Sequence, residues 1–189
     1  MSTVKSKKLQ VGTDATSSNN FTIYQPATPD GTLRIGVGNA DSPTEVGRFN
    51  SNGYVATNAP AFSASSAGQS VSNSTWTKIA YSTEQFDTNS EYDSTTNYRF
   101  LPSVAGYYQI NVSAAMNTGT PFQIASAIYK NGSPYSYGTN TTGSFGSVST
   151  VLLYLNGSTD YVEGYCLQAS GGSLNTVNSV FSGILVKAT

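Results

Sequence analysis

Paired acidic side chains are the residues of this 189-residue chain whose types and spacing best suit catalysis. Asp87 lies near Glu91 and Asp93, and Asp160 lies near Glu163. Two carboxyl groups can drive glycoside hydrolysis as general acid and nucleophile, so these pairs would serve a polysaccharide-degrading enzyme. All of them fall at expected turns or strand starts, where Asp commonly accepts hydrogen bonds from its own backbone. We therefore favour a structural role and expect no catalytic site.

Other catalytic and metal chemistry has few candidates. The chain contains no His, which removes the Ser-His-Asp and Cys-His arrangements and imidazole metal sites. Its single Cys166 can form no intrachain disulfide, and its strand-like neighbours favour a buried, inert thiol. Asp87, Glu91 and Asp93 offer hard oxygen ligands for calcium, although a solvated acidic turn is the favoured alternative. We expect no cofactor.

Aromatic residues within a polar segment are the candidate ligand-binding side chains. The segment SPYSYGTNTTGSFG places Tyr135, Tyr137 and Phe145 in a flexible context between strands. Exposed aromatic rings can stack on a sugar or a protein while polar neighbours form hydrogen bonds. Packing of these rings across strands within the protein is an equal alternative.

Composition indicates an all-β protein. Charged residues make up 10% of the chain and the net charge is −1, so a polybasic surface for nucleic acid or anionic lipid is excluded. Hydrophobic residues make up 38% and aromatic residues 12%, which is enough for a packed core. No apolar run reaches the roughly 20 residues of a membrane helix. The N-terminus lacks the apolar stretch of a secretory signal, so we expect synthesis in a cytoplasm.

The pattern of apolar residues divides the chain into segments 1–56 and 57–189. The second segment contains alternating apolar stretches, bounded by turn residues, at near-regular spacing. This spacing is typical of an antiparallel sandwich or barrel. We predict strands at 60–65, 75–81, 97–102, 106–116, 122–131, 147–156, 160–169 and 178–188.

The first segment has too few apolar residues to form an independent core. The alternation of Leu33, Ile35 and Val37 nevertheless favours an ordered strand over a floppy arm. We predict a small intertwined β-hairpin segment in which three chains share a core. Its lysines, Lys5, Lys7 and Lys8, are candidates for attachment to a partner protein, and a solvated basic end is the alternative.

Ordered motifs in the second segment resemble the globular head domain of complement's first component, which belongs to the tumour necrosis factor-like jelly rolls. The match covers roughly residues 58–189. It departs from the family pattern at the loop 157–160, which is longer here. The motifs are AFSA at 61–64, Phe86-Asp87, Tyr92-Asp93, Phe100, Gly106-Tyr107-Tyr108, Lys130-Asn131-Gly132, LLYLNGSTDYVEGYCL at 152–167 and FSGILV at 181–186.

The resemblance implies an antiparallel jelly-roll β-sandwich that forms a homotrimer. It further implies that the central strand, the leucine-rich strand and the final strand lie in the inner sheet. Tyr107, Leu153, Phe181 and Leu185 are then the candidates for the trimer interface, and core packing within one subunit is the alternative for each.

The stretch GTLRIGVGNADSPTEVGRFNSNGYV looks like the β-hairpin modules of tailed-bacteriophage fibre proteins. This similarity implies a virion protein, a fibre, spike or head decoration, whose knob attaches to a host surface glycan or protein. Its N-terminal segment would bind other virion proteins, with Lys5, Lys7 and Lys8 as the candidates for virion attachment. The alternatives are a carbohydrate-binding trimer of a bacterial surface or spore coat and, less favoured, a polysaccharide-degrading enzyme.

Overall fold

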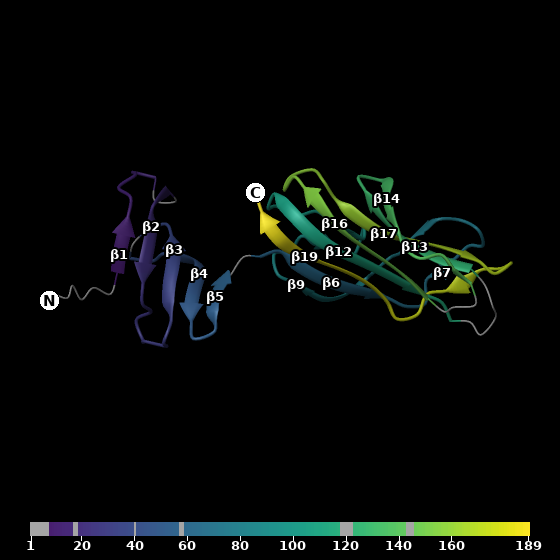
Figure 1. Ribbon diagram of the computed structural model, residues 1–189, viewed down its shortest axis with the longest axis horizontal. Coiled ribbons are helices and arrows are strands. Elements are labelled where there is room, and N and C mark those ends of the chain that lie inside the picture. The colour runs from purple at the N-terminus through teal and green to yellow at the C-terminus, as the bar shows by residue number, and fades with distance from the viewer. Residues whose placement is uncertain (1–7, 17–18, 40, 57–58, 118–122, 143–145) are drawn as a thin grey trace. The chain divides into compact units, whose positions relative to one another are not determined.

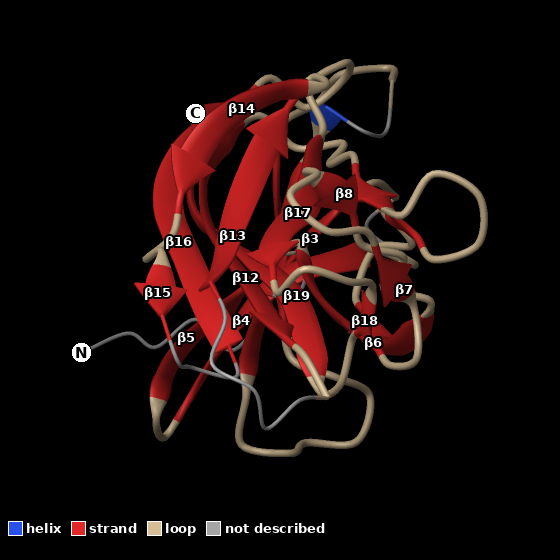
Figure 2. Ribbon diagram, turned by 90° about the vertical axis from the view of Figure 1, so that its right-hand side faces the viewer, coloured by secondary structure: helices blue, strands red, loops and turns tan. Residues whose placement is uncertain are grey.

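The computed structural model describes residues 8–16, 19–39, 41–56, 59–117, 123–142 and 146–189. These residues form strands joined by turns and loops, with one short 3₁₀ turn at Asn19 (Figure 2). Within the described ranges, no helix has the length and apolar character needed to cross a membrane. The contacts divide the chain into two compact units, Met1–Ala59 and Pro60–Thr189.

The first unit is a single antiparallel sheet whose strands follow the order of the sequence (Figure 1). Asp30 and Asn50 stabilise two of its connecting turns by accepting hydrogen bonds from the backbone N–H groups of Thr32 and Asn52. Such short connections make each strand pair with its neighbour in sequence. The strands are β1 (Lys8–Val11), β2 (Phe21–Tyr24), β3 (Leu33–Val37), β4 (Thr44–Asn50) and β5 (Gly53–Ala56).

The second unit is a sandwich of two antiparallel sheets (Figure 1). One sheet, which we call the inner sheet, has the order β16 (Gly146–Leu155), β12 (Gly106–Ala115), β19 (Ser179–Ala188), β6 (Ala61–Ser66) and β9 (Thr83–Asp87). The outer sheet has the order β10 (Tyr92–Asp93), β11 (Arg99–Phe100), β17 (Val162–Ala169), β13 (Gln123–Lys130) and β14 (Ser133–Tyr137). Short β15 (Thr141–Thr142) pairs with β13, and β8 (Thr77–Lys78) pairs with β17. A separate pair consists of β7 (Ser70–Val71) and β18 (Leu174–Asn175). The predicted all-β antiparallel jelly roll is confirmed.

Alternation along β12 shows why this strand lies at the centre of the inner sheet. Tyr108, Ile110, Val112 and Ala114 are buried, whereas the intervening residues face away from the core. The strand pairs along its length with β16 on one side and β19 on the other. The period-2 pattern predicted from the sequence therefore gives the observed strand.

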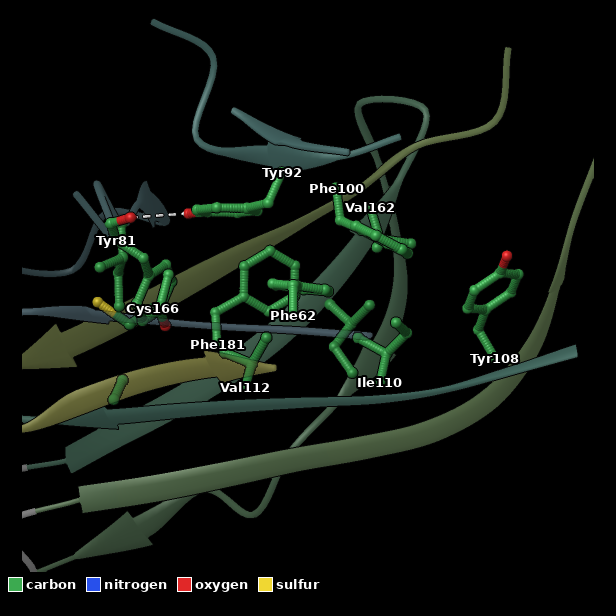
Figure 3. Packing of buried hydrophobic residues seen from close by; sticks show 14 of the residues in the cluster. Phe62, Tyr81, Tyr92, Phe100, Tyr108, Ile110, Val112, Val162, Cys166 and Phe181 are labelled. Carbon is green, nitrogen blue, oxygen red and sulfur yellow. Dashed lines mark hydrogen bonds between the residues drawn. The ribbon is translucent and has the colours of Figure 1, made fainter. Parts of the chain in front are cut away.

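Aromatic side chains from both sheets fill the core (Figure 3). The Phe62 ring stacks on Tyr92 and Phe100, with centroid distances of 4.9 Å and 4.4 Å, and meets Phe181 edge-on at 4.8 Å. The buried Tyr92 hydroxyl donates a hydrogen bond to the backbone oxygen of Tyr81 at 2.9 Å. This bond satisfies a polar group that would otherwise be costly to bury.

Several boundaries differ from those expected. The predicted strands at 75–81 and 97–102 are reduced to the two-residue strands β8 and β11, and the intervening strand β9 was not predicted. Residues 133–137, expected to be flexible, form β14 through the Asn131-Gly132 turn. Positive φ values of 52° and 75° at these two positions suit a tight hairpin.

Candidate interaction surfaces

The outward face of β16, β12 and β19 exposes a group of large apolar side chains. This inner-sheet face is defined by Tyr107, Val148, Leu152, Tyr154, Val180, Ile184 and Val186, whose exposed fractions range from 38% to 59%. The reverse side of the same strands forms the core. Apolar residues on both sides of a sheet are typical of a sheet that packs between two layers.

Strand register brings these side chains together. Gln109 of β12 lies between Leu152 and Ile184, and Ser113 lies between Val148 and Val180. The rings of Tyr107 and Tyr154 meet edge-on with a centroid distance of 5.7 Å. The apolar residues therefore form a continuous patch across three strands, and patches of this kind usually mark binding surfaces.

The polar residues of the inner-sheet face are neutral and bonded to one another. Gln109 Nε2 donates to Thr150 Oγ1 at 2.7 Å, and Thr150 Oγ1 donates to Asn111 Oδ1 at 2.6 Å. The outward positions of these strands from Tyr107 to Ser113, Val148 to Tyr154 and Val180 to Val186 carry no charged side chain, and Lys187, which pairs with Tyr107, lies at the edge of the patch. Depletion of charge is a property of the centres of protein interfaces.

Three of the four predicted interface residues lie on the core side of the sheet. Tyr107 is 44% exposed and belongs to the inner-sheet face. Leu153 and Phe181 are buried in the core, and Leu185 packs against that core. For Leu153, Phe181 and Leu185 the structure shows the alternative, core packing within one subunit, and their outward neighbours Leu152, Val180 and Ile184 hold the exposed positions.

The outer sheet carries a second surface, rich in aromatic rings. Tyr129 and Tyr165 stack with a centroid distance of 3.8 Å, and Trp76 contacts Tyr137 at 5.4 Å. Tyr137, Ala127, Tyr165 and Lys78 form one row across the sheet by register. We call this outer aromatic surface the group Trp76, Tyr129, Tyr135, Tyr137 and Tyr165.

The predicted ligand-binding residues are partly on this surface. Tyr135 and Tyr137 are 52% and 59% exposed on β14, a regular strand, and Phe145 lies outside the described residues. The contribution of Trp76 was missed because the sequence separates it from Tyr137 by 61 positions. Trp76 directly precedes β8, which pairs with β17, and Tyr137 belongs to β14, which pairs with the neighbouring strand β13. Only this pairing places the two residues on one sheet.

Charged side chains border the outer aromatic surface. Lys78 Nζ donates to the buried Glu163 carboxylate at 2.6 Å. The Arg99 guanidinium lies over the Tyr161 ring, 4.5 Å from its centroid. Rings combined with nearby hydrogen-bonding groups are suited to flat polar ligands such as sugars.

The carboxyl groups near residue 90 each stabilise a different turn. Asp87 accepts hydrogen bonds from the backbone N–H groups of Asn89 and Tyr92, and Glu91 accepts from Ser103. The backbone N–H groups of Thr96 and Thr95, with further donors at Asn97, hold the pKa of Asp93 well below its usual value.

These three acidic residues do not form a shared site. Glu91 and Asp93 line the same surface hollow, and Asp87 lies outside it. Over the residues that the structure describes, no group of three acidic, His or Cys side chains is placed to hold a metal ion. The calcium candidates Asp87, Glu91 and Asp93 are thus turn-forming residues.

Asp160 and Glu163, the second acidic pair, form ion pairs with different lysines. The Asn131 side-chain amide and the Lys130 ammonium hold the pKa of Asp160 below its usual value. Glu163 is bound to Lys78 on the outer sheet. Asp160 and Glu163 therefore each have a cation of their own.

The structure describes the surroundings of Cys166 and Lys8 among the remaining predicted residues. Cys166 is fully buried, and burial raises the pKa of its thiol to about 12, as expected for an inert cysteine. Lys8 donates to the backbone oxygen of Asp41 at 3.3 Å. Lys5 and Lys7 lie outside the described residues.

No protein-family model matches this chain, and no curated protein matches it significantly. Several solved structures match the chain. Murine APRIL matches with a TM-score of 0.50 and 8% identity, over 68% of this chain and 100% of that one. The globular domain of zebrafish complement 1qA matches with a TM-score of 0.45 and 18% identity, over 69% and 99%. The Eiger TNF of S. frugiperda matches with a TM-score of 0.45 and 11% identity, over 69% and 93%. At these identities the likeness concerns the fold alone, and it is the APRIL match that supports the fold.

Proposed function

We propose that this protein is a non-enzymatic homotrimer that forms part of a tailed-bacteriophage virion, as a fibre, spike or head decoration. Its C-terminal unit assembles through the inner-sheet face and binds a host surface ligand. Its N-terminal unit attaches to other virion proteins. The observation that carries the proposal is the apolar inner-sheet face, with its uncharged centre, on a fully formed sandwich.

Association through this face has a direct physical cause. Seven large apolar side chains about half exposed to water form an unfavourable surface, and burying apolar area yields about 25 cal/mol per Å². Identical faces can meet here with little repulsion, because the centre of the patch carries no charge and Lys187 lies at its edge. The motif resemblance to the complement head domain favours three copies over two, since that family forms trimers.

The virion setting rests on the sequence of residues 31–55, which resembles phage fibre modules. The outer aromatic surface also suits a carbohydrate-binding trimer of a bacterial surface or spore coat. Immunogold labelling separates these candidates, because antibody to this protein labels phage particles in the first and cell or spore surfaces in the second.

The absence of catalysis is supported by the acidic residues. Asp87, Glu91, Asp93 and Asp160 are all engaged by backbone or side-chain donors. Glu163 is buried against Lys78. For Asp93 and Asp160 these donors lower the pKa of the carboxyl group, which makes both residues poor general acids.

Charge placed on the inner-sheet face tests the proposed assembly. Leu152→Asp and Ile184→Asp each put a carboxylate where subunits would meet, and burying an unpaired charge costs about 3 kcal/mol or more, a hundredfold or larger loss of association. Tyr135→Asp is the matched control, because Tyr135 is 52% exposed on the other sheet and Leu152 is 54% exposed. Light scattering should give one-chain mass for the first two variants and three-chain mass for the control. Equal masses for all three proteins would contradict the proposal.

A further inference from the structure

The N-terminal sheet has one apolar face that no other element of its own unit covers, over the residues that the structure describes. Leu9 and Val11 of β1 pair with Ile23 and Phe21 of β2, and these pair in turn with Ile35 and Val37 of β3. On the other side of β3, Leu33 pairs with Phe49 of β4. Directly paired residues share a face, so these side chains form one patch. We call this patch the N-terminal apolar face; its members are Leu9, Val11, Phe21, Ile23, Leu33, Ile35, Val37 and Phe49.

This face is exposed to water in the single chain. Leu9 and Val11 are 59% and 57% exposed, and Phe21, Leu33 and Phe49 are 46–48% exposed. A single-layer sheet has no second layer to cover its apolar side, and stable domains pack at least two layers around a core. The N-terminal apolar face therefore needs a partner.

The opposite face is already covered and charged. Glu45 binds Arg34 at 2.9 Å and Arg48 at 2.6 Å. Beside these pairs, Gly36 and Thr22 are buried, and a Cβ at Gly36 would lie 2.7 Å from Pro43 Cβ and 3.1 Å from the Tyr24 ring. The sheet is thus amphipathic. Its polar side is covered by the loop that contains Pro43 and by the ion pairs of Glu45.

The chemistry of the two faces identifies the partner. The N-terminal apolar face contains no charged residue, so several copies of it can meet without like-charge repulsion or desolvation of ions. Copies of the opposite face could not meet in this way, because Arg34, Arg48 and Glu45 would lose their hydration on contact. Linkage to a trimeric C-terminal unit would also hold three copies at an effective concentration in the millimolar range.

We propose that the N-terminal apolar face packs against the same face of the other two chains, so that three amphipathic sheets enclose a common hydrophobic core. This inference rests on the proposed trimer of the C-terminal unit. Each sheet is complete within one chain, with β1 to β5 paired in sequence order. The core is therefore shared through faces, whereas the sequence had predicted intertwined strands.

Disulfide trapping in the full-length chain tests this packing. Ile23→Cys places a thiol on the N-terminal apolar face, and Gln10→Cys is the matched control, because Gln10 is exposed on the other face of the adjacent strand β1. Cys166 is fully buried, so it contributes little background. Leu9→Cys on the edge strand β1 is a second variant, in case the central change impairs folding.

The expected result is cross-linking of the two apolar-face variants into chain pairs upon mild oxidation, at a yield independent of dilution. In a three-fold arrangement one bond joins two of the three chains, so the yield should approach two-thirds, with less than a tenth for Gln10→Cys. Light scattering on the same samples keeps the two claims separate. A three-chain mass with apolar-face cross-linking no higher than the control overturns this inference and leaves the proposed trimer intact, which would indicate another occupant of the face. A one-chain mass overturns the proposed trimer and, with it, this inference.

Discussion

Gly183 illustrates how one residue sets the packing of the core. A Cβ at this position would lie 2.6 Å from Ile110 Cδ1 and 2.7 Å from Phe62 Cε1. The glycine therefore lets the Phe62 ring lie flat against β19 and stack on Tyr92 and Phe100. This contact gives a physical reason for the glycine in the Phe-Ser-Gly motif of the last strand.

We predict that Gly183→Ala destabilises the protein by about 1–3 kcal/mol, since overpacking a filled core displaces its neighbours. Urea unfolding at fixed protein concentration measures the change. Ser182→Ala, one position along on the outward side of the same strand, should alter the unfolding free energy far less. Equal stability of wild type and Gly183→Ala would show that the core is loosely packed at this point.

Acid should destabilise the turns formed by Asp93 and Asp160. Both carboxyl groups have pKa values lowered from 3.8 by hydrogen-bond donors. Groups with lowered pKa values add stability above their unfolded-state pKa and lose it as the pH falls through the folded-state pKa. We predict an unfolding temperature that is constant from about pH 8 to pH 5 and falls below about pH 4. Asp93→Asn should lower stability at pH 7 and weaken the acid-dependent decrease. An unfolding temperature that rises between pH 4 and pH 3 would be inconsistent with these turns.

Residue-level predictions failed where both sides of a strand are apolar. In VLLYL at 151–155, Leu152 and Tyr154 alternate with Leu153 and Leu155, and hydrophobicity cannot decide which pair faces the core. The structure places Leu153 inside and Leu152 outside. A strand that packs between two apolar layers has no polar side. The apolar residues that form the candidate interface therefore also make the orientation of this strand ambiguous in the sequence.

Among the elements, long strands were predictable and short ones were not. The boundaries of β12, β13, β16 and β19 lie within one residue of those expected, since alternation over eight or more residues is a strong signal. Strands β8, β10 and β11 have two residues each and depend on neighbours distant in sequence. Strand β14 was missed because its Ser, Pro and Tyr residues lack an apolar pattern.

The aromatic surface of the outer sheet gives a prediction at this scale. Trp76→Ala and Tyr137→Ala, which remove the two contacting rings, should each weaken binding to a host glycan or to host cells about fivefold, because one stacked ring is worth about 1 kcal/mol. Glycan arrays and cell adsorption measure the effect. Phe86→Ala is the matched control, since Phe86 is 51% exposed on the inner sheet. Unchanged binding by both variants would remove this surface from the proposed function.

For the whole molecule, a sparse N-terminal segment before a dense β domain was apparent from the sequence, and contacts separate Met1–Ala59 from Pro60–Thr189. The exposed faces could not be predicted, because they depend on the register of strands distant in sequence. Both units leave an apolar face outside their own cores. Assembly of several copies is the simplest arrangement that covers both.

The mass of the full-length chain in solution tests this account most directly. Light scattering after size exclusion, repeated on dilution to about 1 µM, should give three times the chain mass of 19.8 kDa throughout. A folded, soluble protein with the mass of one chain at every concentration would contradict it.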